Sequence, residues 1–230
     1  MTRVEPLAAI TAATRGLLAS AERLDDAAMR APSLLPGWTR GHVLTHVARN
    51  ADGGTRLLTW ARTGVESREY PSVDARAAEI EAGAGRPAAV LVADVRDSAE
   101  RWAEAYAAMP DDAWERVVQW TSGARRPAAR ASDARLTEVL THHVDLDAGF
   151  GPADWPADYV ARMLPNIVAS YARRDAALRL RVHATDTGAV HGDGEVAVSG
   201  PASSLLAWLM GRTDGRELTG AEGVALPFLY

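Results

Sequence analysis

The chain has 230 residues, of which 47% are hydrophobic, 24% charged and 6% aromatic. This composition is ordinary for a globular protein and excludes intrinsic disorder, a collagen-like repeat and a coiled-coil fibre. The 30 acidic residues outnumber the 25 basic ones, leaving a formal net charge of -5. Nothing in this balance favours a phosphate backbone as a ligand, so we expect no nucleic-acid partner.

Cysteine is absent from the sequence. Disulfides, thiolate metal ligands and a nucleophilic thiol carried by the protein are therefore excluded, and any sulfur chemistry must come from a cofactor. The start of the chain mixes charged residues with short apolar groups and does not resemble a signal peptide. The longest apolar stretches fall short of the ~18 residues that a membrane helix requires. We therefore expect a soluble, cytoplasmic protein with no membrane partner.

Four stretches in the first part of the chain carry apolar residues at helical spacing, which is typical of a helical bundle. Thr39 is suited to cap the second of these helices, and Ser132 or Asp133 the fourth. The expected helices span residues 6–30, 39–62, 91–110 and 132–148.

The segments between these helices give weaker signals. Residues 68–86 are irregular or weakly helical in pattern. Arg125 and Arg126 follow Gly123 and precede Pro127, so we expect them in a mobile surface loop. Two basic residues without an aromatic platform are weak support for nucleic-acid binding.

The clearest break in the chain lies at Gly149, Gly151, Pro152 and Pro156. Beyond it the pattern predicts a helix over 157–177 bent at Pro165, strands over 178–184, 190–191 and 195–199, and a short helix over 203–210. The sequence therefore predicts an α+β protein, with a helical bundle over residues 1–150 and a small α/β domain over residues 151–230.

Glu138 and His142 are four residues apart, so on a helix they lie about 40° from each other and can bind one ion. His46 lies at the edge of the face that the second helix turns to the interior. Two histidines and one carboxylate are the ligands of a catalytic type of zinc site, which leaves the fourth position open.

The same periodicity supports a second interpretation. Glu138, His142 and Asp145 lie opposite the apolar stripe of their helix, which is typical of a solvated face. A lone histidine such as His46 is more often a packing or surface residue than a ligand. The metal site therefore requires the fourth helix to be buried on both sides. His143 lies nearer the apolar stripe, and we expect it to be a hydrogen-bonded packing residue.

Three segments resemble one known family. These are Leu-Pro-Gly-Trp-Thr at 35–39 leading into Val-Leu-Thr-His-Val-Ala-Arg-Asn-Ala-Asp at 43–52, Glu-Val-Leu-Thr-His-His-Val-Asp-Leu at 138–146, and Leu-Leu-Ala-Trp-Leu-Met-Gly-Arg at 205–212. Together they resemble the mycothiol-dependent maleylpyruvate isomerases over nearly the whole chain. The resemblance implies that the N-terminal part is a DinB-like four-helix bundle. It also implies that His46, Glu138 and His142 are zinc ligands and that Arg212 lies near the metal.

The family's activity is the isomerisation of maleylpyruvate to fumarylpyruvate by reversible addition of a thiolate. The resemblance implies Zn²⁺, or another divalent metal, and mycothiol as the thiol cosubstrate. Arg212 would be catalytic, pairing with a substrate carboxylate or stabilising the enolate. Asp145 could hold a histidine ring in orientation, or it could be an exposed carboxylate. Arg49 and Asn50 could contact the thiol, or they could lie on a solvated helix face.

Two other functions remain open at this point. A mycothiol S-transferase would use the same zinc-activated thiolate but leave the sulfur on its product, in detoxification or natural-product assembly. A non-catalytic metal-binding module would keep the bundle without turnover. Function belongs to the site rather than to the fold, so the sequence does not separate these alternatives. A small-molecule substrate and a low-molecular-weight thiol are the expected partners, and the protein is expected to be a monomer or a small homo-oligomer.

Overall fold

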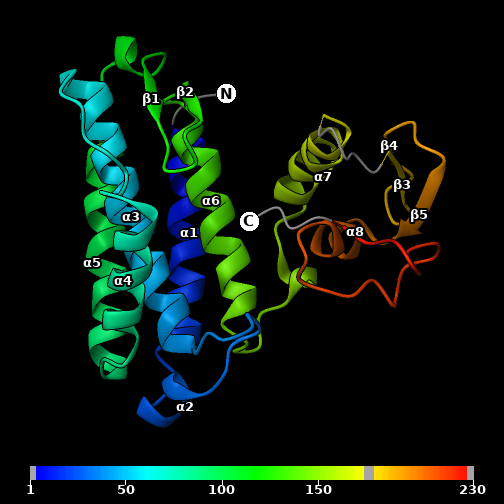
Figure 1. Ribbon diagram of the computed structural model, residues 1–230, viewed down its shortest axis with the longest axis horizontal. Coiled ribbons are helices and arrows are strands. Elements are labelled where there is room, and N and C mark those ends of the chain that lie inside the picture. The colour runs from blue at the N-terminus through cyan, green and yellow to red at the C-terminus, as the bar shows by residue number, and fades with distance from the viewer. Residues whose placement is uncertain (1–3, 174–178, 227–230) are drawn as a thin grey trace. The chain divides into compact units, whose positions relative to one another are not determined.

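A computed structural model describes residues 4–173 and 179–226 of the chain. The chain forms two compact units, Met1–Gly149 and Phe150–Tyr230. The described residues are mostly helical, with small β-sheets (Figure 1), which confirms the predicted α+β class.

The first unit is a bundle built on four long helices. These are α1 (Val4–Ala21), α3 (Arg40–Thr63), α5 (Ala88–Ala107) and α6 (Arg130–Asp145). Helix α3 packs against both α5 and α6, and α1 packs against the same two helices (Figure 1). Two shorter helices, α2 (Asp26–Arg30) and α4 (Val73–Ala84), both contact α3. Helix α3 therefore packs against α2, α4, α5 and α6.

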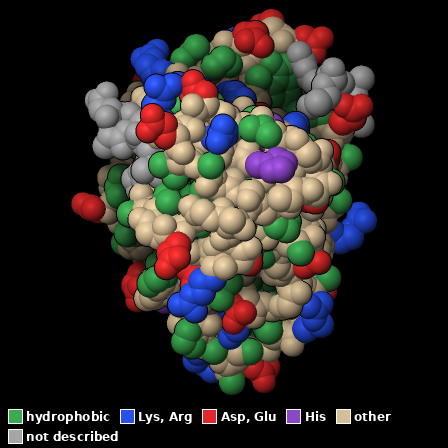
Figure 2. Space-filling view, turned by 90° about the vertical axis from the view of Figure 1, so that its right-hand side faces the viewer, with side chains coloured by type: hydrophobic (Ala, Val, Ile, Leu, Met, Phe, Trp, Pro, Cys, Tyr) green, Lys and Arg blue, Asp and Glu red, His purple; other side chains and the backbone are tan. Residues whose placement is uncertain are grey.

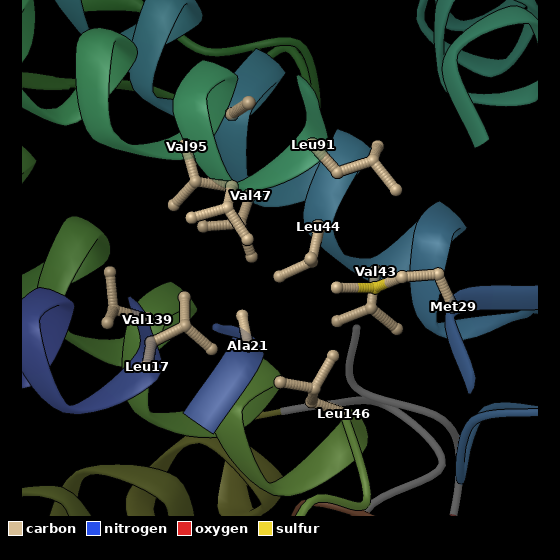
Figure 3. Close-up of a cluster of buried hydrophobic side chains, with 12 residues drawn as sticks. Leu17, Ala21, Met29, Val43, Leu44, Val47, Leu91, Val95, Val139 and Leu146 are labelled. Atoms are coloured by element: carbon tan, nitrogen blue, oxygen red, sulfur yellow. The ribbon is translucent and has the colours of Figure 1, made fainter. Parts of the chain in front are cut away.

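The core of this bundle is formed by apolar residues at helical spacing (Figure 3). Leu17 and Ala21 are one turn apart on α1, and both are fully buried. The other helices contribute Val43, Leu44, Val47, Leu91, Val95 and Val139. Burying such side chains contributes roughly 1.5–3 kcal/mol each, which is how the periodic pattern specifies the packing of the helices.

The predicted helix over residues 6–30 is wrong in one respect, because the structure divides it into α1 and α2. Asp25 lies between them with extended backbone, and its side chain accepts a hydrogen bond from the amide of Ala28 at 2.8 Å. An aspartate that caps a new helix stabilises a break in the chain. The apolar periodicity continued across this break and concealed it.

Two segments between the long helices are more regular than predicted. Residues 73–84 form α4, a helix that begins at the N-cap Ser72, whose side chain accepts from the amide of Ala75. Arg125 and Arg126 lie in a strand, β2 (Arg125–Pro127), which pairs antiparallel with β1 (Val117–Gln119). The expectation of a mobile loop there is wrong, because the two arginines lie in a hydrogen-bonded hairpin, whereas their expected surface position is confirmed. A short 3₁₀ helix (Asp111–Ala113) precedes this hairpin.

Helix α6 is buried on both sides. It packs against α1 and against α3, and nearly all its residues from Arg135 onward are buried. The polar side of the helix is therefore not a solvated face, and the condition for the metal site is met within the bundle itself. The helix begins at Arg130, slightly before the predicted caps, and its N-cap residue Ala129 makes no side-chain capping bond.

The second unit combines two helices and a three-stranded sheet. A 3₁₀ turn (Pro152–Asp154) leads into α7 (Ala157–Ala172), and α8 (Ala202–Leu209) follows the sheet. The strands are β3 (Leu180–Ala184), β4 (Val190–His191) and β5 (Val196–Gly200), in the order β4-β3-β5.

Strand β3 pairs antiparallel with β4 and parallel with β5, and both helices contact β3. Its burial alternates along the strand, as the period-two pattern predicts. The two helices and three strands predicted for this unit are confirmed, although the first helix ends at Ala172 and the first strand begins at Leu180. Pro165 lies within α7, and the bend expected there stays a prediction. Residues 174–177 of the predicted helix and Leu178 of the predicted strand lie outside the described residues.

Acidic and basic side chains are intermixed on the face shown in Figure 2, and neither charge forms a continuous patch on that face. Among the described helices, none combines the length and apolar character needed to cross a membrane.

Candidate metal centre

Three side chains from two helices converge inside the first unit. His46 comes from α3, and Glu138 and His142 come from α6. The Nε2 atom of His46 lies 3.0 Å from Oε2 of Glu138, and Nε2 of His142 lies 3.3 Å from the same oxygen. One ligand atom of each residue lies within 4.8 Å of the others. The structure thus brings together the three residues that the sequence singled out as metal ligands.

The start of α3 determines where His46 points. Thr39 and His42 form a capping box: the Thr39 hydroxyl accepts from the His42 amide, and Nδ1 of His42 accepts from the Thr39 amide. His46 follows one turn later and is 3% exposed. The ring of Trp38 lies edge-on to it, with 5.6 Å between ring centroids. The cap and this aromatic contact hold the imidazole toward α6.

Asp145 fixes the ring of His142. Its Oδ2 lies 2.8 Å from Nδ1 of His142, and the carboxylate is fully buried. This confirms the predicted orienting contact and excludes an exposed surface position. A carboxylate on one ring nitrogen directs the other nitrogen toward a ligand. The neighbouring His143 lies 2.8 Å from the Ser20 hydroxyl and is buried, which agrees with its predicted packing role.

Burial and mutual contacts shift the pKa values of all three residues. Burial, reinforced by the charge of His142, lowers the pKa of His46 from 6.5 to about 4. Burial acts to raise the pKa of Glu138, but hydrogen bonds with His142 and His46 outweigh it and hold that pKa well below 4.5. Burial also acts to lower the pKa of His142, but the hydrogen bonds to Asp145 and Glu138 raise it above 6.5. In the metal-free state the cluster therefore holds an ionised carboxylate between two histidines of different basicity.

This set of donors fits a divalent cation of the zinc type. Zn²⁺ accepts imidazole nitrogen and carboxylate oxygen, and three protein ligands leave a position for a water or a substrate atom. The nitrogens of His46 and His142 already converge on one oxygen of Glu138. The contact between Asp145 and His142 is the kind that supports a metal-bound histidine.

The two residues proposed as thiol contacts are engaged within the bundle. Arg49 forms ion pairs with Asp52 and Asp94, at 3.0 and 2.6 Å. The side-chain oxygen of Asn50 accepts from Arg135 at 2.9 Å. Both residues lie on α3 about one turn beyond His46 and are partly buried. Their contact with a thiol stays a prediction.

Arg212 belongs to the second unit. It follows Gly211, which has a φ of 72° in the turn after α8. Nη1 of Arg212 donates to the carbonyl of Met210 at 2.8 Å. Its catalytic role stays a prediction.

Two arginines beside the site were missed at the sequence level. Nη2 of Arg76, on α4, lies 3.1 Å from Nδ1 of His46, and its guanidinium lies 5.7 Å from the ring centroid of Tyr70. Arg135 is 3% exposed on α6, and burial lowers its pKa to about 10. The sequence does contain a signal for Arg135, because it lies three residues before Glu138 and therefore on the same face of one helix. It contains no local signal for Arg76, because residues 68–86 are irregular or weakly helical in pattern.

Comparisons with known proteins agree with this geometry. Residues 10–147 match the mycothiol maleylpyruvate isomerase N-terminal domain, and residues 154–227 match the C-terminal domain of the same family. A crystal structure of the mycothiol-dependent maleylpyruvate isomerase superposes with a TM-score of 0.91 at 28% identity, covering 100% of this chain and 98% of that one. A histidine-to-alanine mutant of that enzyme gives the same values. A comparison with curated protein sequences returned no match. The two domain matches together confirm the resemblance, and the chain belongs to the mycothiol maleylpyruvate isomerase family.

Proposed function

We propose that the protein is a mycothiol-dependent cis-trans isomerase that converts maleylpyruvate to fumarylpyruvate and depends on a divalent metal ion, with Zn²⁺ as the expected ion. The observation that carries this proposal is the convergence of His46, Glu138 and His142 within a chain of this family. The solved relatives are named for the same thiol and the same substrate. The small-molecule substrate and the thiol are the partners of the reaction.

Isomerisation about a carbon–carbon double bond requires that the bond become single for a time. A thiolate can add to the conjugated double bond of the substrate, forming a C–S bond and moving an electron pair onto the carbonyl oxygen as an enolate. After rotation, collapse of the enolate restores the double bond and expels the thiolate. The thiol is regenerated, and no oxidant or reductant is needed.

The sulfur must come from outside the protein, because the chain contains no cysteine. A bound divalent cation would favour the thiolate form of a small thiol near neutral pH. His46, Glu138 and His142 would hold that cation, and Asp145 would keep the His142 ring in place.

The remaining predicted residues would serve the two small molecules. Arg212 would pair with a substrate carboxylate or the developing enolate, using its planar set of donors. Arg49 and Asn50 would contact polar groups of the thiol from the turn of α3 beyond His46.

The test is to incubate protein of known metal content with mycothiol and maleylpyruvate, following the absorbance and the mass of the product. Fumarylpyruvate together with recovered free mycothiol supports the isomerase. A stable thiol adduct with a general electrophile such as a bimane, without isomerisation, would identify an S-transferase instead. Bound zinc with neither activity would identify a binding module.

A matched pair of variants on α3 tests the residues. The His46→Gln variant should lose most of its zinc, and its turnover should fall by more than about 100-fold, because the substitution removes a ligand rather than a supporting contact. His42→Gln is the control one turn earlier, since glutamine can keep the capping box with Thr39. Equal zinc content and turnover in both variants would contradict the proposed site.

A further inference from the structure

Among the described residues, the guanidinium of Arg76 lies beside the candidate metal centre without an acidic partner. Its Nη2 lies 3.1 Å from Nδ1 of His46, and the side chain is partly exposed. Among residues 4–173 and 179–226, no carboxylate oxygen lies within salt-bridge distance of it. A cation that is partly buried and not neutralised by the protein is suited to bind an anion.

The other guanidinium groups near the site already donate to oxygen atoms. Arg56 is the closest comparison, because it lies 5.8 Å from the centroid of the same Tyr70 ring. Its donors are directed to the carbonyls of Arg68 and Glu69. Arg49, Arg86 and Arg135 likewise donate to carboxylate, amide or carbonyl oxygens. Arg76 is distinguished from them by donating to a ring nitrogen.

Nδ1 of His46 accepts a hydrogen bond only when it carries no hydrogen. A guanidinium is purely a donor, so the bond from Arg76 requires a lone pair on Nδ1. An imidazole that binds a cation through Nε2 carries its hydrogen on Nδ1, and two donors would then face each other. Because Nε2 of His46 is the atom directed at Glu138, occupation of the site would leave Arg76 in need of another acceptor.

The position of Arg76 is set by close packing of α4 on α3. A side chain at Gly41 of α3 would overlap the carbonyl of Ala84, and one at Gly83 of α4 would lie 2.5 Å from the Thr45 side chain. The Tyr70 ring supports the guanidinium with 5.7 Å between its carbon and the ring centroid. The donors of Arg76 are thus held in a defined position at Nδ1 of His46, on the same imidazole ring whose Nε2 is a candidate ligand atom.

We propose that Arg76 binds a carboxylate of the substrate beside the centre formed by His46, Glu138 and His142. This inference rests on the proposed function, and it gives the site a preference for small carboxylates. The fork of a guanidinium matches a carboxylate with two parallel hydrogen bonds. Arg76 would provide this contact from the first unit, independently of Arg212.

The test measures binding of maleate, a small cis dicarboxylate, to the zinc-loaded full-length protein by calorimetry without thiol. Arg76→Met should weaken maleate binding by about tenfold or more, as loss of a charge-assisted contact implies, and Arg76→Lys should recover part of it. The uncharged diamide of maleate should bind weakly to all variants. Zinc content, measured by mass spectrometry, should stay at the wild-type level.

Arg56→Met is the matched control, since it removes the other guanidinium at Tyr70 without removing the proposed contact. Unchanged maleate binding in Arg76→Met, an equal loss in Arg56→Met, or no maleate binding by the wild-type protein would overturn the role of Arg76. Arg76-dependent maleate binding by a protein that does not isomerise maleylpyruvate with mycothiol would instead contradict the proposed reaction alone.

Discussion

His46 and His142 touch the same oxygen of Glu138 but differ in basicity. Burial dominates at His46, whose pKa falls to about 4, whereas Asp145 supplies a second acceptor to His142 and raises its pKa. The second ring nitrogens also differ in their partners. At His46 this nitrogen faces the guanidinium of Arg76, which adds to the larger effects of burial and of the His142 charge, whereas at His142 it faces the buried carboxylate of Asp145.

This difference predicts how the stability of the metal-free protein depends on pH. His46 has a lower pKa folded than unfolded, so the unfolded chain binds more protons between pH 6.5 and about 4. The contribution of His46 to the free energy of unfolding is complete above pH 6.5 and is lost as the pH falls towards about 4. His142 acts oppositely, contributing below pH 6.5 and losing that contribution as the pH rises through its raised pKa.

The expected loss from His46 is about 3 kcal/mol of unfolding free energy by pH 4. Urea unfolding of the metal-free wild type and of His46→Gln at a series of pH values measures it. The wild type should lose more stability than the variant over this range. Parallel curves for the two proteins would show that His46 is not held neutral by burial.

At the scale of elements, the contact of α3 with α4 depends on two glycines. Gly41 faces the end of α4, and Gly83 faces Thr45 on α3. Glycine lowers helix propensity by about 1 kcal/mol relative to alanine, so both positions cost local stability. The close approach that they permit brings Arg76 of α4 to His46 of α3.

Gly41→Ala should therefore destabilise the protein despite the better helix propensity of alanine. The new methyl group would overlap the carbonyl of Ala84, and overpacking of this kind costs about 1–3 kcal/mol. Gly85→Ala is the control at the end of α4, since a methyl group there meets nothing within 4 Å. Urea unfolding measures both. Equal stability of the two variants would show that α4 can move away from the new methyl group without a loss of unfolding free energy.

At the scale of the whole molecule, the three candidate ligands belong to the first unit alone. Their helices α3 and α6 are joined by hydrogen bonds between residues about ninety positions apart, such as that between His46 and Glu138. A cation bound there would cross-link these helices within the native bundle. The second unit has its own sheet and helix pair.

Adding zinc to the metal-free protein should stabilise the first unit selectively. Binding to the folded state alone contributes about 2.7 kcal/mol when the free metal is at 100 times its dissociation constant. Hydrogen–deuterium exchange should show slower exchange in α3 and α6 and little change in α7 and α8. An equal response of all four helices, or none in α3 and α6, would contradict the placement of the site.

The sequence by itself determined the long helices, the period-two strand, the break near Gly149 and the pairing of Glu138 with His142. These features depend on local periodicity, on Gly and Pro, and on spacing along one helix, which are all properties of neighbouring residues. The pattern of the second predicted helix added His46 as a third candidate, and the resemblance to a known family implied that all three residues are ligands.

Only the tertiary structure decided that the polar side of α6 is buried, that Asp145 contacts His142, and that Arg76 reaches His46. The pattern of α6 is amphipathic in either case, and its neighbours α1 and α3 determine whether the polar side meets water or protein. The helix that carries Arg76 has a weak pattern, and its position depends on packing against Gly41. Contacts between distant segments arise from which faces bury each other, and a single stretch of sequence does not contain that information.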